Sequence, residues 1–458
     1  MSGSYSIALS GLNAAQTGLD VVSQNIANAS TPGYLAEQVN LSPLVDQASQ
    51  TGDGVQVASV SAVSSEIANN ALTSAIGAQD YAQSLSQSLG QIQSTVNEPS
   101  SMGISEQLSS FWNAFDQVAN NPSQLAPRQQ LIAQAQTLAA TFNQRAASYG
   151  QIYNSTVSQI QGSLTTVNSQ LQQVAKLNQE ILASGPNPSA SVVSARNQLV
   201  QSLAGELGVT VQSQTDGSIN LLAGGTMLVQ GTLAGKLALS APTAPPIPSA
   251  AGVQVVVAGS GSPVPVASGS VGGLLQVTND YLPAYSSALD QQAAQLAQQV
   301  NSQLTAGNYY NQGSTSATPG VPLFVFGGNG TSIAANLGVS SSVAANPYEI
   351  AAAGNPPTGP NDGSNAQILA EMGTLSNGVD SMYSSWIGTM GLDVQSAQNL
   401  ASSSATTYQS AYQNFQSVSG VSTNDQLVKM LNYQQGYQAA AKVISTISAS
   451  IQSLMQAV

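Results

Sequence analysis

The sequence of 458 residues contains neither cysteine nor histidine. Without cysteine there is no disulfide, thiolate nucleophile or cysteine metal site. Without histidine the chain also lacks the commonest zinc ligand, the base of Ser-His and Cys-His nucleophile pairs, and the side chain that changes charge near neutral pH. We therefore expect no enzymatic activity, no cofactor and no metal site.

Charged residues are scarce as well. Seven Lys and Arg and 20 Asp and Glu make up 6% of the chain, where about 25% is usual. The net charge is -13, and phosphate binding needs clustered cations, so nucleic acid is not an expected partner. Because so few carboxylates change charge near pH 4, the composition would also suit an acidic habitat. The sequence leaves the habitat open.

Long apolar runs are missing too. Residues 1–5 lack the basic and continuously apolar segments of a cleaved signal peptide. No stretch of about 18 apolar residues, the length that a membrane-spanning helix needs, occurs anywhere in the sequence. We expect no membrane partner and no export by a cleaved signal.

What the chain does contain is a pair of matching apolar seams near its two ends. Apolar residues that recur every seven positions, with a second series three residues later, form the a/d pattern of a helix that packs lengthwise on another. The first seam includes Tyr5, Leu12, Ala15, Leu19, Val22 and Ile26. The second includes Met430, Tyr433, Tyr437, Ile444, Ile447, Ile451, Leu454 and Val458. A terminal helix with Ala at most d positions buries little alone, so we predict that these residues form an assembly interface, with each other or with neighbouring subunits.

Between the seams, apolar periodicity predicts long helices and one β-rich segment. The helices are expected at about 4–28, 64–97, 104–119, 127–183, 191–207, 277–305, 365–376 and 379–417. The Pro32-Gly33 pair is suited to a type II turn after the first helix, and residues 35–63 are expected to form a short strand pair. Residues 209–275, which include a hairpin and the run Val264–Val266, are expected to be β-rich.

The predicted fold is mainly α with a β-rich insertion, in an elongated, multi-domain molecule. Segments 1–40 and 420–458 would form a coiled-coil-like terminal domain of N- and C-terminal helices. Segments 41–190 and 276–419 would form a long-helix bundle, and residues 191–275 a small β domain.

The sequence offers little that is reactive. The acidic residues are scattered singly, without the paired carboxylates of a glycosidase. The stretch Gly231–Lys236 fails the phosphate-loop pattern because Gln230 and Leu237 stand where a Gly and a Ser or Thr are required. Asp362 and its neighbours are better suited to a helix turn than to a calcium loop. The aromatic residues Phe111, Trp112 and Phe115 are expected in the core.

The two ends resemble the signatures of the bacterial flagellar axial proteins, which comprise the rod, hook and hook-associated subunits. The matching stretches are residues 10–16 (SGLNAAQ), 25–28 (NIAN), 31–34 (TPGY) and 433–445 (YQQGYQAAAKVIS). The interior resembles the hook-associated protein 1 family, the first hook-filament junction proteins, at residues 127–132, 196–200, 208–217 and 269–275. Larger members carry extra material after the Leu323–Phe326 region, where this chain has a short loop-rich segment.

The resemblance implies a structural role in a secreted, extracellular flagellum. The subunit would form a ring with copies of itself, contact hook subunits on one side, and contact a second junction protein or flagellin on the other. Members of the family leave the cell through the flagellar type III apparatus with an export chaperone. The terminal helices would assemble into the inner tube around a channel.

Three other functions stay open at this point. A hook or rod subunit is the nearest alternative, although the simplest of these lack a long helical region like residues 64–183. A secreted adhesin with a helical stalk would not need matched seams. A hydrolase within the β-rich segment is disfavoured by the missing His and Cys.

Overall fold

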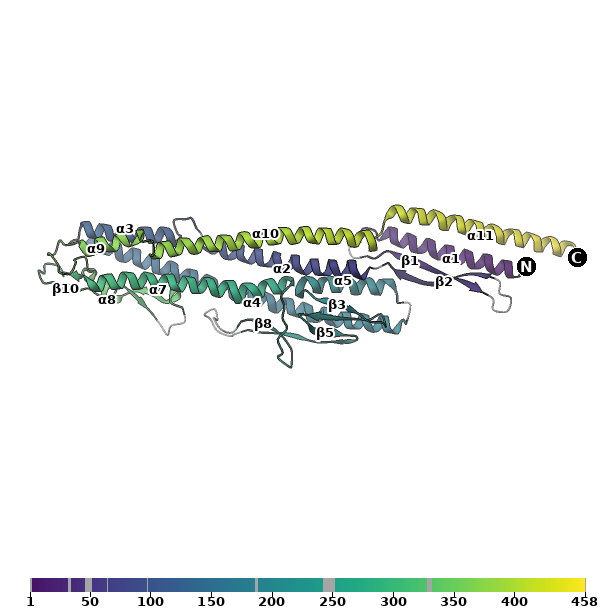
Figure 1. Cartoon of the computed structure of the whole chain (residues 1–458), viewed down its shortest axis with the longest axis horizontal. Helices are drawn as coiled ribbons and strands as arrows, with labels where there is room; N and C mark the ends of the chain where they lie inside the picture. Colours follow the sequence, from purple (N-terminus) through teal and green to yellow (C-terminus); the bar gives the residue numbers. More distant parts are fainter. Residues whose placement is uncertain are drawn as a thin grey trace.

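The computed structural model describes residues 2–31, 34–45, 52–63, 65–96, 98–185, 188–241, 252–327 and 332–457. Figure 1 shows a rod of long helices that run side by side, with both chain ends at the same end of the rod. The fold is mainly α with small β-sheets, which confirms the predicted fold class.

Each long helix predicted from apolar periodicity is present. These helices are α1 (Ser2–Ala27), α2 (Glu66–Val96), α3 (Ile104–Asn120), α4 (Leu125–Ala183), α5 (Ala190–Leu207), α7 (Leu282–Ala306), α10 (Val379–Ser419) and α11 (Thr423–Ala457). Shorter helical pieces are α6 (Gly269–Gln276), α8 (Ser341–Ala345), α9 (Ser364–Glu371), the 3-10 turns η2 (Ala334–Asn336), η3 (Pro347–Glu349) and η4 (Met372–Thr374), and the π-helical turn η1 (Val277–Tyr281). With 59 residues, α4 is about 90 Å long at 1.5 Å per residue.

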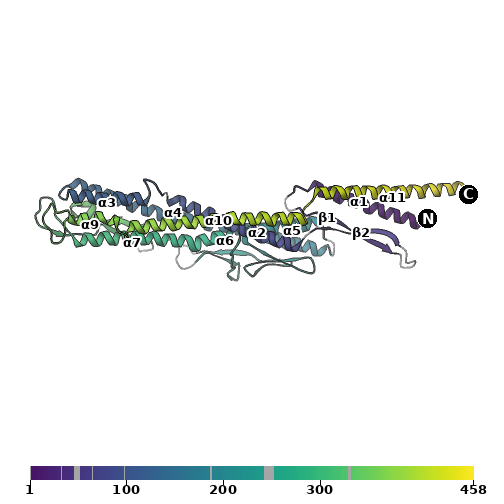
Figure 2. The same cartoon turned by 45° about the horizontal axis from the view of Figure 1, so that its top comes forward.

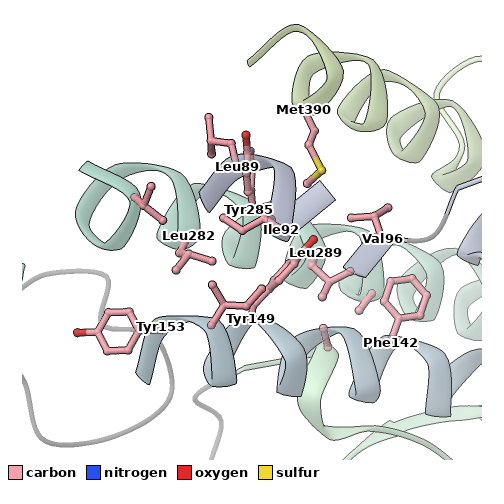
Figure 3. Close-up of a cluster of buried hydrophobic side chains, with 14 of the residues drawn as sticks. Leu89, Ile92, Val96, Phe142, Tyr149, Tyr153, Leu282, Tyr285, Leu289 and Met390 are labelled. Atoms are coloured by element: carbon pink, nitrogen blue, oxygen red, sulfur yellow. The ribbon is translucent and has the colours of Figure 1, made fainter. Parts of the chain in front are cut away.

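The centre of the rod is a bundle of α2, α4, α7 and α10. Helix α10 returns along α2, and Figure 2 shows the same side-by-side course after a turn of 45°. Figure 3 shows side chains from all four helices meeting in one cluster. Its labelled members are Leu89, Ile92, Val96, Phe142, Tyr149, Tyr153, Leu282, Tyr285, Leu289 and Met390. The outgoing and returning halves of the chain thus share one core.

At the end of the rod away from the termini, α3 packs on α4 and α9 through aromatic side chains. Phe111 and Phe115 are fully buried and meet edge to face, with ring centroids 5.1 Å apart. Phe324 lies 5.6 Å from Phe111, and Trp112 is also buried. The prediction that the aromatics of α3 are core residues is confirmed.

The β structure consists of small antiparallel sheets. The terminal hairpin pairs β1 (Glu37–Val45) with β2 (Gly52–Ala62), as expected for residues 35–63. A four-stranded meander contains β3 (Thr210–Ser213), β4 (Ile219–Ala223), β5 (Thr226–Gln230) and β6 (Leu233–Ala234). Three two-stranded sheets pair β7 (Leu237–Ser240) with β8 (Gln254–Val257), β9 (Asn308–Tyr309) with β10 (Thr318–Pro319), and β11 (Phe324–Phe326) with β12 (Leu337–Val339). The expected type II turn at Pro32 and Gly33 lies outside the described residues.

Single asparagines attach strands to the long helices. Asn178 of α4 donates to the carbonyls of Ile219 (2.8 Å) and Gly231 (2.7 Å) and accepts from the Ile219 amide. Asn168, also on α4, pairs in the same two-way manner with the backbone of Leu237. A side-chain amide donates and accepts at once, so a chain with few charges can satisfy strand backbone without ion pairs.

The segment before residue 277 differs from the prediction. Residues Gly269–Gln276 form helix α6, where β structure was expected through residue 275, and Val264–Val266 is not a strand. A Cβ on Gly273 would lie 2.6 Å from the carbonyl oxygen of Tyr81 on α2. The Gly272-Gly273 pair therefore lets α6 approach α2 closely enough to bury Leu274 and Val271. Glycine here serves helix packing, although it normally indicates a turn.

Candidate assembly interface

The two terminal helices lie against each other in antiparallel order. Gln426 of α11 contacts Asn25 of α1, a Cβ on Gly18 would lie 2.5 Å from the Tyr433 ring, and a Cβ on Gly436 would lie 3.9 Å from the Ala15 methyl group. The two numbers of each contact add up to 451, so numbering rises along one helix as it falls along the other. Figure 1 shows the same opposite course of the two helices.

The structure brings most of the two seams together. Ala15 and Val22 are buried. The half-buried seam residues are Leu12, Leu19, Ile26, Met430, Tyr433, Ile444 and Ile447. The exposed ones are Tyr5, Tyr437, Ile451 and Leu454. Val458 lies outside the described residues. The seams thus supply each other with a partner in one chain, while their role in contacts between subunits stays a prediction.

Helix α11 extends past the beginning of α1. In the antiparallel register the first described residue, Ser2, lies beside Ala449, so the last turns of α11 have no helix opposite them. Figure 1 shows the C-terminus beyond the N-terminus. Leu454 is 52% exposed and Met455 is 77% exposed. We call this overhang, residues 450–457, the C-terminal extension.

A second apolar surface lies on the other end of α11. Leu427, Val428 and Leu431 are each at least half exposed. Exposed leucines and valines that cluster at the end of a helix mark a contact surface more often than scattered ones do. The paired helices therefore present apolar side chains both at the C-terminal extension and beside the junction with the bundle.

Asn25 fixes the geometry of the terminal helices. Its side chain is fully buried and donates to the Glu37 carbonyl (2.8 Å) and to Oε1 of Gln426 (3.1 Å). Its oxygen accepts from the Glu37 amide (2.8 Å) and from the Tyr34 hydroxyl (3.1 Å). All four hydrogen-bonding positions of the amide are thus occupied. One side chain joins α1, the hairpin and α11.

Two side chains beside Asn25 have raised pKa values. Burial raises the pKa of the Glu37 carboxyl above its ordinary value. Burial, and secondarily the charge of Glu37, raises the pKa of Tyr34 to about 12. Tyr34 therefore keeps its proton at neutral pH and can donate it to Asn25. The raised pKa of Glu37 means that its ionisation opposes folding above that pKa, and the penalty disappears as the pH falls.

A small cluster connects the terminal helices to the bundle. Leu35, Ala68, Leu72 and Phe415 are buried together, separate from the main core. The backbone of Ser419, at the end of α10, accepts from the Ala36 amide (3.0 Å), and its side chain accepts from the Ser65 amide (3.3 Å). The terminal helices and the bundle thus have separate cores that meet at one narrow joint.

The described residues offer no reactive cluster. Within them, no group of three or more acidic residues is placed to hold a metal ion. Asp362 accepts from the amides of Thr358 (3.0 Å) and Ser364 (2.9 Å), at the start of α9. Burial opposes its ionisation, but these bonds outweigh burial and lower its pKa to about 2. Asp362 therefore lies in the turn that leads into α9, which begins at Ser364. Over the same described ranges, no helix is long and apolar enough to span a membrane.

Sequence patterns alone did not identify four of these functional residues. Asn25 and Tyr34 belong to the N-terminal signature, but their spacing gives no sign that they meet. Gln426 has no distinctive pattern at all. At Gly18 the missing side chain leaves room for the Tyr433 ring. A polar residue amid an apolar seam was the one available signal for Asn25.

An elongated helical chain with paired ends and exposed apolar ends of helices is typical of a structural assembly protein. The model of the flagellar hook-associated protein FlgK helical domain matches residues 89–324, more than half of the chain. The chain belongs to the flagellar hook-associated protein FlgK family. It is a structural component of the flagellum and not an enzyme. The ends match two further models, the flagella basal body rod protein at residues 6–34 and the flagellar basal body rod FlgEFG protein C-terminal at 412–457.

Named relatives agree with this family. Flagellar hook-associated protein 1 of Bacillus subtilis is 26% identical over 95% of this chain and 94% of its own length. The protein of the same name from Salmonella typhimurium is 30% identical over 76% of this chain and 66% of its own length. The hook junction protein FlgK from Burkholderia pseudomallei has the same fold, with a TM-score of 0.63 and 18% identity over 76% of this chain and all of that one.

Proposed function

We propose that the chain forms an adaptor ring that joins the flagellar hook to the filament. The observation that carries the proposal is the terminal helix pair, which is complete enough to fold in one chain yet leaves apolar side chains exposed at the C-terminal extension and at Leu427, Val428 and Leu431. Such surfaces need further copies or neighbours to cover them. The predicted seam residues would hold the pair together and line these contacts.

The proposed division between the terminal segments and the rest of the chain follows the two separate buried clusters. The terminal segments 1–40 and 420–458 assemble, the segments 41–190 and 276–419 form a stiff spacer, and the segment 191–275 projects outward. The joint at Leu35, Ala68, Leu72 and Phe415 supports this division, because the buried residues there do not belong to the main core. The outward segment includes α5 and α6, which pack on α2.

The ring would contact hook subunits on one side and a second junction protein or flagellin on the other. The names of the relatives refer to the hook and to the hook junction, and this supports the placement. Export through the flagellar type III apparatus with a chaperone, to an extracellular position, completes the proposal. A rod or hook subunit is less well supported, because the rod models match the two ends and the interior matches the FlgK helical domain.

Immunogold electron microscopy of isolated flagella tests the placement. Antibody against the segment 191–275, which we propose to face outward, should label one narrow band between hook and filament. Hooks with basal bodies from cells that lack the chain provide the control for nonspecific gold. Labelling along the whole hook would identify a hook subunit, and labelling confined to the basal body would identify a rod subunit. Either pattern would overturn the adaptor proposal.

A further inference from the structure

The paired terminal helices carry few charges, and those charges cancel. Helices α1 and α11 contain two acidic residues and two lysines, which are Asp20, Asp425, Lys429 and Lys442. The remaining five Lys and Arg and 18 Asp and Glu of the chain carry the whole net charge of -13. All four side chains on the helix pair are exposed. The chain has few charges, yet the two terminal helices carry both acidic residues and lysines. We therefore consider a contact between opposite charges on these helices.

Asp20 and Lys442 face away from the contact between the two helices. Asp20 follows Gly18, which touches Tyr433, by two residues, and therefore points about 200° around the axis of α1 from that contact. Lys442 follows Tyr433 by nine residues, which turns it about 180° around α11. The two charges thus lie on opposite outer surfaces of the helix pair, one on each side.

The two charges cannot meet within one chain. Asp20 lies level with Leu431, and Lys442 is eleven residues further along α11, about 16 Å away along the axis. Among the described residues the only ion pair is between Lys176 and Glu180, at 3.9 Å. The other two charged residues of the two helices, Asp425 and Lys429, do not lie on these outer surfaces. Both line a cavity of about 550 Å³ at the joint with α10.

We propose that Asp20 of one copy pairs with Lys442 of a neighbouring copy, an inference that rests on the proposed assembly function. The contact joins the outer surface of α1 in one subunit to the outer surface of α11 in the next. Such a contact is heterologous, so it repeats from copy to copy around a ring or helical turn. It places adjacent copies about 16 Å apart along the helix axis. Apolar contacts alone would let two neighbouring copies slide along each other. One ion pair between the copies fixes their relative position along the helix axis.

Charge reversal in flagellated cells tests the pair. In a strain that lacks the chain and is complemented with variants, Asp20→Lys and Lys442→Asp should each lower the number of filaments per cell at least tenfold, because like charges then meet. The double variant should restore at least half of the wild-type number. Lys236→Asp makes the same charge change at an exposed lysine on the β-rich segment and should behave as wild type. Normal filaments in both single variants, or no recovery in the double variant, would overturn the pairing.

Cross-linking tests the same geometry without relying on charge. The chain has no cysteine, so Asp20→Cys with Lys442→Cys places the only two thiols at the proposed contact. A short bis-maleimide should convert the variant in isolated flagella into a ladder of linked chains, whereas each single variant should stay monomeric. Monomer alone in the double variant, or dimers in a single variant, would contradict the pairing.

Two arms of the same experiment separate this inference from the proposed function. If the wild-type chain restores filaments and Ile444→Glu does not, assembly through the terminal helices stands whatever the charge variants do. If both charge variants then assemble normally, only the Asp20–Lys442 pair is wrong. If cells without the chain already make normal filaments, the proposed function itself is wrong.

Discussion

We expect that the variant Ile444→Glu is not incorporated into flagella, while its long bundle stays folded. Ile444 is half-buried on α11, and the antiparallel register places it beside the first turns of α1. A carboxylate there must leave water or force the helices apart, at a cost of about 2–4 kcal/mol. A helix takes most of its stability from the packing of its apolar face, so the pair separates when that packing is lost. Leu19→Glu should have the same result from the other helix.

The bundle should survive because its core does not include the terminal helices. The main core runs from Leu85 to Ala397, and only the small cluster at Leu35, Ala68, Leu72 and Phe415 lies between it and the pair. Circular dichroism of the purified variant should show the main melting transition at the wild-type temperature with some helix lost. Leu392→Glu, an aliphatic-to-Glu change at a site on α10 that is 72% exposed, is the matched control and should assemble normally. Loss of the main transition in Ile444→Glu would refute the separation of the two cores.

We expect the variant Arg128→Met to lose about 3–5 kcal/mol of bundle stability. Arg128 is 3% exposed, and its guanidinium donates to the carbonyls of Pro122 (2.8 Å), Tyr348 (3.1 Å) and Ile350. Its cation also lies 5.7 Å from the centre of the Tyr348 ring. Burial lowers the pKa of Arg128 to about 10, so the group stays charged at neutral pH. Methionine fills the space but leaves these carbonyls buried without donors.

Urea unfolding of purified protein measures this loss. The midpoint should fall for Arg128→Met, and Arg128→Lys should lie between it and wild type, because lysine keeps the charge but not the fork of donors. Lys236→Met removes an exposed cation and should change the midpoint little. Equal midpoints for Arg128→Met and Lys236→Met would show that the loop of residues 347–350 does not depend on this arginine.

Apolar periodicity predicted the helices well because their buried faces are long and regular. The residues from Ile160 to Ile181 on α4, for example, lie inward at the predicted spacing. The hairpins β1–β2 and β3–β4 were also predicted, because turn residues separate alternating runs, whereas the pairs β9–β10 and β11–β12 were not. Helix α6 was not, since Gly272 and Gly273 act through close approach to Tyr81, and a contact between distant segments leaves no local pattern.

The candidate interface shows the same limit. The repeat of seven identified which residues of α1 and α11 form seams, but a repeat does not state whether helices run parallel or antiparallel. The direction depends on contacts such as Asn25 with Gln426 and Gly18 with Tyr433. The C-terminal extension is a consequence of that register, and the sequence pattern alone does not predict it. Asn25 became recognisable as the central polar residue only once α1, β1 and α11 were placed together.

Neutral amides account for the unusual composition. Asn25, Asn168 and Asn178 each bridge a helix to strand backbone by donating and accepting together. Charged pairs would perform that task only with a desolvation cost. The chain then retains few charges, and those on α1 and α11 cancel.

Electron microscopy of cells that lack the chain, with an immunoblot of the culture medium for flagellin, tests the adaptor role most directly. The account predicts hooks without filaments and flagellin lost to the medium, because no surface remains on which filament subunits can assemble. Intact filaments on these cells would contradict it.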